Sequence, residues 1–167
     1  MPDLLLILVP RHPERFKPVA RLCEQKGLTL VKRSEHSVVT EQTQVFLGDS
    51  MGEMLTYFSV SDVAFVGGSL VNTGCHNVLE PAALGLPVIV GPSQFNFQSI
   101  CEQLESAGAL KTVPDANGLA QAVLQVFADE SLRHTMGAAG RQLIEDNRGA
   151  LQRIETLVWQ ACQATRI

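Results

Sequence analysis

The chain has 167 residues, 46% of them hydrophobic, and a formal net charge of −4 at pH 7. This length and apolar content are typical of one globular domain with a sizeable core, and the acidic balance argues against a nucleic-acid-binding protein, which usually carries a basic stripe. The four cysteines match no zinc motif, which predicts reduced thiols and no metal site; they are Cys23, Cys75, Cys101 and Cys162.

The first predicted element is a strand from Leu4 to Val9. Its apolar residues are continuous, as is typical of strands buried on both faces of a parallel sheet. The run is too short to cross a bilayer and lacks the features of a signal peptide. Because the chain begins abruptly on a core strand, we expect it to be one half of a larger protein. A helix is predicted from Pro13 to about Lys26, capped by Gly27, with an inner face of Phe16, Val19, Ala20, Leu22 and Cys23.

Arg11 lies between this strand and this helix, next to Pro10. Doubly wound sheets bind ligands at the carboxyl ends of their strands, and a guanidinium is a good partner for phosphate or carboxylate. The alternative is an exposed loop arginine that binds nothing. Its place at the end of a strand favours the binding role.

The next part of the chain alternates short apolar runs with polar segments. Strands are predicted at Leu28–Lys32 and Val45–Leu47, and the polar segment 33–44 between them has no hydrophobic period. A turn then leads into a helix over 51–59, with an apolar face of Met54, Leu55 and Phe58. At its start, Gly52 would let a base or ribose lie against the backbone. Met51 is either a ligand contact or a core side chain, the commoner role of methionine.

A β-loop-α-β unit is predicted from Val63 to Pro92. The two strands are Val63–Val66 and Leu86–Val90, and a short helix precedes the second strand. Pro81 fits only the first turn of a helix, so this helix should begin between Asn77 and Glu80.

The loop before this helix has the composition of a nucleotide site. Gly67 and Gly68 permit close approach of a ligand to the backbone, and the helix start offers N–H groups and a positive dipole end to an anion. The Glu80 carboxylate suits a ribose diol, as acidic residues do in dinucleotide folds. The alternative is that Glu80 only complements the helix dipole. Four polar side chains crowd this loop, which favours binding: Asn72, His76, Asn77 and Glu80.

The last part of the chain continues the alternation. Asn96 lies in a further loop at a strand end and could reach a ligand. Helices are predicted over 98–106, 117–128, 131–146 (with Ser131 near its N-cap) and 150–162, and a strand over 109–113. The order of elements predicts a Rossmann-like three-layer α/β/α sandwich with about six parallel strands. The chain has no GxxxxGK[ST] run and no GxGxxG after the first strand, which argues against a P-loop kinase and an NAD domain.

Three motifs together resemble a known family. They are PRHPERF at 10–16, GDSMGE at 48–53, and GGS at 67–69 followed by GCHNVLEPAALGLPVIVGP at 74–92 and by Asn96-Phe97. This combination resembles the C-terminal, donor-binding half of the lipopolysaccharide 3-deoxy-D-manno-octulosonic acid (Kdo) transferases, glycosyltransferases of the GT-B fold. The resemblance covers roughly residues 4–157. Cys75 and Val78 depart from the Gly-Gly-His-Asn-Pro that family members mostly have, which affects the expected loop geometry.

The resemblance implies CMP-Kdo as the nucleotide-sugar donor, with no cofactor and no metal. The donor-binding residues that it implies are Pro10, Arg11, Met51, Gly52, Glu53, Asn77, Val78, Leu79 and Glu80. Further candidate contacts are Gly68, Ser69, His76 and Asn96. Arg11 and helix N-terminal amides would stabilise the leaving cytidylate.

The resemblance also implies a division of labour. Residues 1–167 would form one donor-binding domain without a catalytic residue, soluble by itself. An absent N-terminal half would supply the glutamate base, the lipid A precursor site and the contact with the cytoplasmic side of the bacterial inner membrane, so we expect this chain alone to be inactive. Two alternatives stay open: the donor domain of another GT-B enzyme or sugar-nucleotide epimerase that uses a UDP-sugar, and a non-catalytic nucleotide-binding or interaction module.

Overall fold

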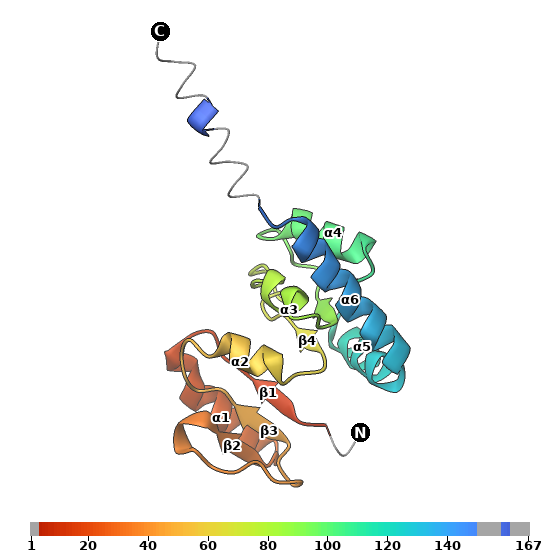
Figure 1. The fold of residues 1–167 in the computed structure, drawn as a ribbon. Coiled ribbons are helices and arrows are strands. Elements are labelled where there is room, and N and C mark those ends of the chain that lie inside the picture. The colour runs from red at the N-terminus through yellow and green to blue at the C-terminus, as the bar shows by residue number, and fades with distance from the viewer. Residues whose placement is uncertain (1–3, 150–157, 161–167) are drawn as a thin grey trace. The chain divides into compact units, whose positions relative to one another are not determined.

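The computed structural model describes residues 4–149 and 158–160. It divides at Ser61 and Asp62 into two compact units, called unit 1 and unit 2 below. In Figure 1, unit 1 runs from red to yellow and unit 2 from yellow to blue. Each unit is an α/β assembly with its own parallel sheet.

Unit 1 contains a three-stranded parallel sheet. Its strands are β1 (Leu6–Leu8), β2 (Leu30–Lys32) and β3 (Val45–Leu47), in the order β1-β3-β2. Val45 and Leu47 of the central strand are buried. The prediction that the first strand is buried on both faces is wrong, because Leu6 is 47% exposed. β1 is an edge strand of this sheet and has a neighbouring strand on one side only.

The helices of unit 1 follow the predicted pattern, except that the first begins with a 3-10 turn and the second begins at Met54 and not at residue 51. A 3-10 turn, η1 (Pro13–Arg15), leads into α1 (Phe16–Gln25), and Gly27 ends this helix with φ 71°. A second 3-10 turn, η2 (Arg33–Glu35), follows β2, and α2 is Met54–Ser59.

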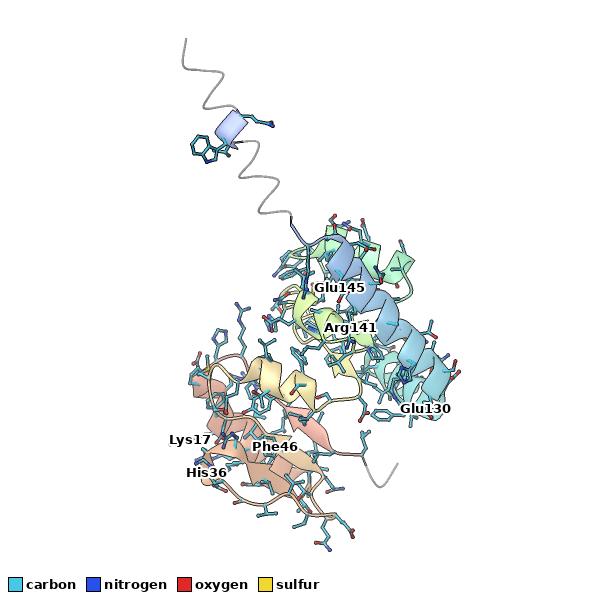
Figure 2. All side chains as sticks on the ribbon, viewed as in Figure 1. Lys17, His36, Phe46, Glu130, Arg141 and Glu145 are labelled. Carbon is cyan, nitrogen blue, oxygen red and sulfur yellow. The ribbon has the colours of Figure 1, made fainter. Side chains whose placement is uncertain are left out.

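Two apolar side chains predicted to face inward do not. Leu22 of α1 is 54% exposed and Leu55 of α2 is 58% exposed, so both predictions are wrong. The buried residue of α2 is Tyr57, whose ring lies 6.1 Å from that of Phe46, a residue labelled in Figure 2. Tyr57 can be buried because its hydroxyl has hydrogen-bond partners in Ser50 and Glu53.

Unit 2 contains the second three-stranded parallel sheet. Its strands are β4 (Ala64–Phe65), β5 (Val88–Val90) and β6 (Leu110–Thr112), in the order β4-β5-β6. The central strand β5 is fully buried, as its run of β-branched residues predicts. The six predicted parallel strands are thus present in the described residues, as two sheets of three, and the Rossmann-like α/β fold class is confirmed.

Four helices pack on this second sheet and on one another. They are α3 (Leu79–Ala83), α4 (Gln98–Ser106), α5 (Ala116–Ala128) and α6 (Glu130–Asp146). Helix α6 packs against α3, α4 and α5, as Figure 1 shows. Most of the predicted last helix, 150–162, lies outside the described residues, of which 158–160 are helical.

The N-cap of α6 is Asp129 and not Ser131. The Asp129 carboxylate accepts a hydrogen bond from the Leu132 amide at 2.9 Å, and Ser131 lies in the first turn. We predict that Asp129→Ala lowers the free energy of unfolding by ~1 kcal/mol, the usual cost of losing such a cap. Ser131→Ala is the matched control and should change it by under ~0.5 kcal/mol. Urea unfolding of both variants measures the difference, and equal effects would contradict this assignment of the cap.

Candidate functional site

The predicted site residues fall into two sets, one in each unit. Unit 1 contains those that follow β1 and β3, and unit 2 contains those that follow β4 and β5. In both units these residues lie at the carboxyl ends of parallel strands, as predicted.

In unit 1, the segment after each of these two strands reaches solvent within a few residues, at Arg11 and at Met51. Arg11 is exposed and lies between β1 and η1, directly after Pro10. Met51 is 64% exposed, which contradicts its alternative role as a core side chain. Gly52 has φ 81°, and no heavy atom beyond Gly52 and its two chain neighbours lies within 4 Å of the place that a Cβ would take. A flat ring could therefore approach the backbone there.

The Glu53 carboxylate of unit 1 accepts hydrogen bonds from three other side chains of this unit. Its Oε1 accepts hydrogen bonds from Arg33 Nη2 at 2.9 Å and Arg33 Nε at 3.3 Å. Its Oε2 accepts from the Ser50 hydroxyl and from the Tyr57 hydroxyl, the latter at 3.2 Å. The hydrogen bond from Ser50, followed by that from Arg33, lowers the pKa of Glu53, so the carboxylate is ionised at neutral pH.

In unit 2, the loop after β4 turns tightly around Gly74. Gly68 has φ 81°, and a Cβ there would collide with the Gly74 carbonyl oxygen. A Cβ on Gly74 would in turn collide with the side chain of Asn96, which comes from the loop after β5. The fold thus brings the candidates Gly68 and Asn96 to one place. Ser69 is fully buried, and its hydroxyl donates to the Val66 carbonyl at 2.6 Å.

Helix α3 begins within the predicted interval, at Leu79. The N-cap residue is Val78, and the Asn77 side chain just before it forms a local turn, because its Oδ1 accepts from the Leu79 amide at 3.0 Å. Asn77 Nδ2 donates to Glu80 Oε1 at 2.9 Å, which fixes the orientation of the half-buried carboxylate. His76 is also half-buried, and its amide donates to the Gly67 carbonyl.

The two departures from the family pattern both enter the core. Cys75 and Val78 have no exposed surface, so a ligand could meet Val78 only through its backbone. The Cys75 sulfur lies 3.9 Å from that of Cys101 on α4. Burial, with the neighbouring Cys75, raises the pKa of Cys101 to about 12, so its thiol is neutral at physiological pH. Cys75 therefore packs the loop against α4.

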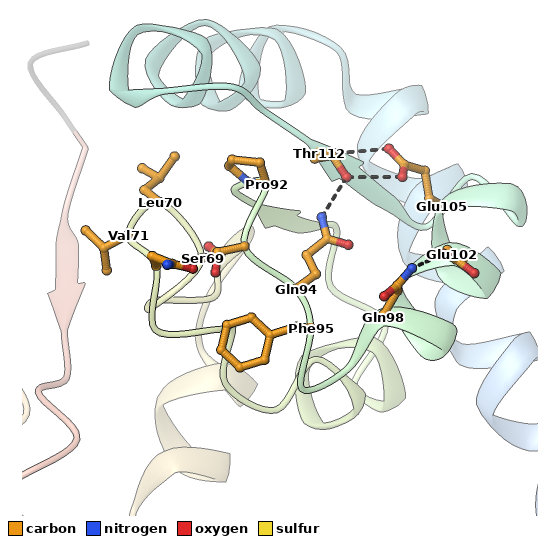
Figure 3. A pocket seen from close by; sticks show the side chains of 12 residues that line it. Ser69, Leu70, Val71, Pro92, Gln94, Phe95, Gln98, Glu102, Glu105 and Thr112 are labelled. Atoms are coloured by element: carbon orange, nitrogen blue, oxygen red, sulfur yellow. Dashed lines mark hydrogen bonds between the residues drawn. The ribbon is translucent and has the colours of Figure 1, made fainter.

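Unit 2 also contains a pocket, and only Ser69 and Asn72 of its lining residues are candidate site residues predicted from the sequence. Its lining residues come mostly from segments that follow β4 and β5 and from the end of β6, and its volume is about 740 Å³. Figure 3 shows the side chains that line it. Gln94 Nε2 donates to Thr112 Oγ1 at 3.0 Å, and Thr112 donates to Glu105 from its amide and its hydroxyl. The lining residues are Ser69, Leu70, Val71, Asn72, Pro92, Ser93, Gln94, Phe95, Gln98, Glu102, Glu105 and Thr112. The sequence signal for this pocket is a polar residue shortly after a strand, such as Gln94 after β5.

Comparison with known proteins decides the family. Residues 16–143, more than half of the chain, match the family described as glycosyl transferases group 1. The chain belongs to this family. It is also 47% identical over 158 residues to a 3-deoxy-D-manno-octulosonic acid transferase of Haemophilus influenzae, and 39% identical over 153 residues to one of Bordetella pertussis. These matches confirm the predicted resemblance to the Kdo transferases.

Solved structures agree with this assignment. The chain is similar to the C-terminal CMP-Kdo binding domain of WaaA from Acinetobacter baumannii, with a TM-score of 0.83 and 38% identity over 86% of this chain and 75% of that one. A lower similarity, with a TM-score of 0.54 and 13% identity, to the glycosyltransferase WaaG supports the fold alone.

The similarity covers nearly all of this chain but only part of the relatives. The chain spans 37% of the length of the Haemophilus influenzae transferase and 36% of that of Bordetella pertussis. Among residues 4–149 and 158–160, no helix is long and apolar enough to cross a membrane.

Proposed function

We propose that this chain is the donor-binding domain of a Kdo transferase and binds CMP-Kdo. The observation that carries the proposal is the 38% identity and the TM-score of 0.83 to the C-terminal CMP-Kdo binding domain of WaaA. The motifs at 10–16, 48–53 and 67–92 also support it, because they resemble the same half of the same enzymes.

Each proposed contact has a chemical role. In unit 1, Arg11 supplies positive charge for the phosphate, and the open backbone at Gly52 accommodates the base or ribose, next to Pro10, Met51 and Glu53. In unit 2, the Glu80 carboxylate accepts hydrogen bonds from the ribose hydroxyls, and Asn77 orients it. Val78 and Leu79 contribute backbone, and Gly68, Ser69, His76 and Asn96 are secondary candidates.

The whole reaction is part of the proposal. Transfer of Kdo to a lipid A precursor with inversion requires a base that deprotonates the acceptor hydroxyl. We assign that base, a glutamate, and the acceptor site to the part of the relatives that precedes the matched domain, on the cytoplasmic side of the inner membrane. This chain would hold the donor and stabilise the leaving cytidylate.

Thermal unfolding with added nucleotides tests the proposal. CMP at about ten times its Kd should stabilise the fold by ~1.4 kcal/mol and raise the Tm by ~3–6 °C, because ligands that bind only the folded state stabilise it. UMP and NAD at the same concentration should raise it less. Equal or greater stabilisation by UDP would favour the alternative, a GT-B enzyme that uses a UDP-sugar, and no response to any nucleotide would contradict a nucleotide-binding function.

A further inference from the structure

In unit 1, the segment after β2 is tied to the loop after β3. The Ser34 amide donates to Asp49 Oδ1 at 2.8 Å, and its hydroxyl donates to Asp49 Oδ2 at 2.6 Å. The neighbouring Arg33 donates twice to Glu53 Oε1. Two consecutive residues therefore hold both ends of the loop 49–53. From the sequence, 33–44 was predicted only to be a polar loop.

The contacts of Arg33 are specific in geometry. Three of its nitrogens have partners: Nε and Nη2 contact Glu53, and Nη1 lies 3.1 Å from His36 Nδ1. Arg33 and Glu53 are 37% and 30% exposed, so water competes with their ion pair only in part. The other Glu53 oxygen, Oε2, accepts hydrogen bonds from the Ser50 and Tyr57 hydroxyls.

These contacts leave the tip of the loop open. Gly52 has a positive φ and empty space where a side chain would be, and Met51 is exposed beside it. The backbone at the tip is thus accessible while its two ends are held. Glu53 accepts three hydrogen bonds from Arg33 and Tyr57 in addition to that from Ser50. Its carboxylate therefore stabilises the conformation of the loop.

We propose that Arg33 and Ser34 are positioning residues for the nucleotide-binding loop 49–53. Arg33 acts through Glu53, and Ser34 acts through Asp49. Without them, the glycine-containing loop would sample more conformations, and binding would have to order it at a cost in affinity. With them, the ordering is complete before the nucleotide arrives. This inference rests on the proposed function, since it requires that the loop contact CMP.

The first test compares two charge-removing variants of adjacent residues. Arg33→Gln removes the ion pair to Glu53, and Lys32→Gln removes the same charge and an exposed pair to Glu35. Titration calorimetry of the 167-residue chain should show CMP binding about tenfold weaker for Arg33→Gln, and within about twofold of wild type for Lys32→Gln. Equal affinities in the two variants would overturn the proposal.

A second readout separates positioning from a general effect on folding. Hydrogen exchange without ligand should be faster at the amides of 49–53 in Arg33→Gln, while amides of β3 keep their protection. The charge-reversed pair Arg33→Glu with Glu53→Arg should bind CMP more tightly than either single variant. If the double variant binds no better than the weaker single variant, Arg33 does not act through Glu53.

Failure of the proposed function and failure of the positioning role give different results. If wild type shows no CMP binding, the proposed function fails and this inference fails with it, whereas CMP binding by wild type with equal affinities for Arg33→Gln and Lys32→Gln overturns the inference alone. If Arg33→Gln does not fold, Ser34→Ala tests the other end of the loop, because it removes only the hydroxyl bond to Asp49. Unchanged CMP affinity and unchanged exchange in Ser34→Ala would then overturn the inference.

Discussion

Glu80→Ala is expected to weaken CMP binding by ~1.5–3 kcal/mol, the scale of hydrogen bonds to charged groups. The Glu80 carboxylate is half-buried at the start of α3, and Asn77 holds it at 2.9 Å. An oriented carboxylate accepts hydrogen bonds from a ribose diol at little further entropic cost. Alanine removes the acceptor and leaves the ribose hydroxyls without a charged partner. Titration calorimetry on wild type and variant measures the loss.

Glu130→Ala provides the matched control for this experiment. Glu130, labelled in Figure 2, is also an acidic residue in the first turn of a helix, α6, but lies outside the predicted site. Both variants should lose ~0.3–1 kcal/mol of stability from the helix dipole, and only Glu80→Ala should lose CMP affinity. A Glu80→Ala chain that folds, loses no more stability than Glu130→Ala and binds CMP normally would mean that Glu80 only complements the dipole.

Gly137→Ala is expected to destabilise unit 2 by ~2 kcal/mol. Gly137 lies in α6, where a Cβ would collide with the carbonyl oxygen of Gly85, just after α3. That oxygen belongs to the backbone and cannot rotate away as a side chain could, so the two helices must separate locally. Overpacking costs ~3 kcal/mol at the upper end of its usual range, and the higher helix propensity of alanine offsets ~1 kcal/mol of it.

Gly140→Ala, in the next turn of α6, is the matched control. The atoms nearest to a Cβ there are those of Ala109 and Ala82, at 3.4 Å, which is ordinary contact. This variant should therefore be neutral or gain up to ~1 kcal/mol from helix propensity. Urea unfolding of both variants gives the comparison. A loss of the same size in both would show that close approach to Gly85 is not what requires glycine at 137.

Local sequence patterns predict most of the secondary structure and the family. The strand at Val45–Leu47 and the helix at Gln98–Ser106 have the predicted bounds, and α3 begins where Pro81 allows. These features depend on hydrophobic period, on proline and on glycine, which act through residues near in sequence. The motif combination at 10–16, 48–53 and 67–92 likewise indicates the Kdo transferase family without reference to the fold.

Which side chains meet and which are buried depends on how distant segments of the chain pack. Arg33 and Glu53 are 20 residues apart, and Cys75 and Cys101 are 26 apart, yet each pair is in contact. No hydrophobic period encodes such pairs, because a hydrogen bond or a sulfur contact requires two separate segments to pack at a specific distance. Tyr57 is buried although Leu55, two residues earlier on the same helix, is exposed. The cost of burying the Tyr57 hydroxyl depends on the hydrogen-bond partners that packing brings to it.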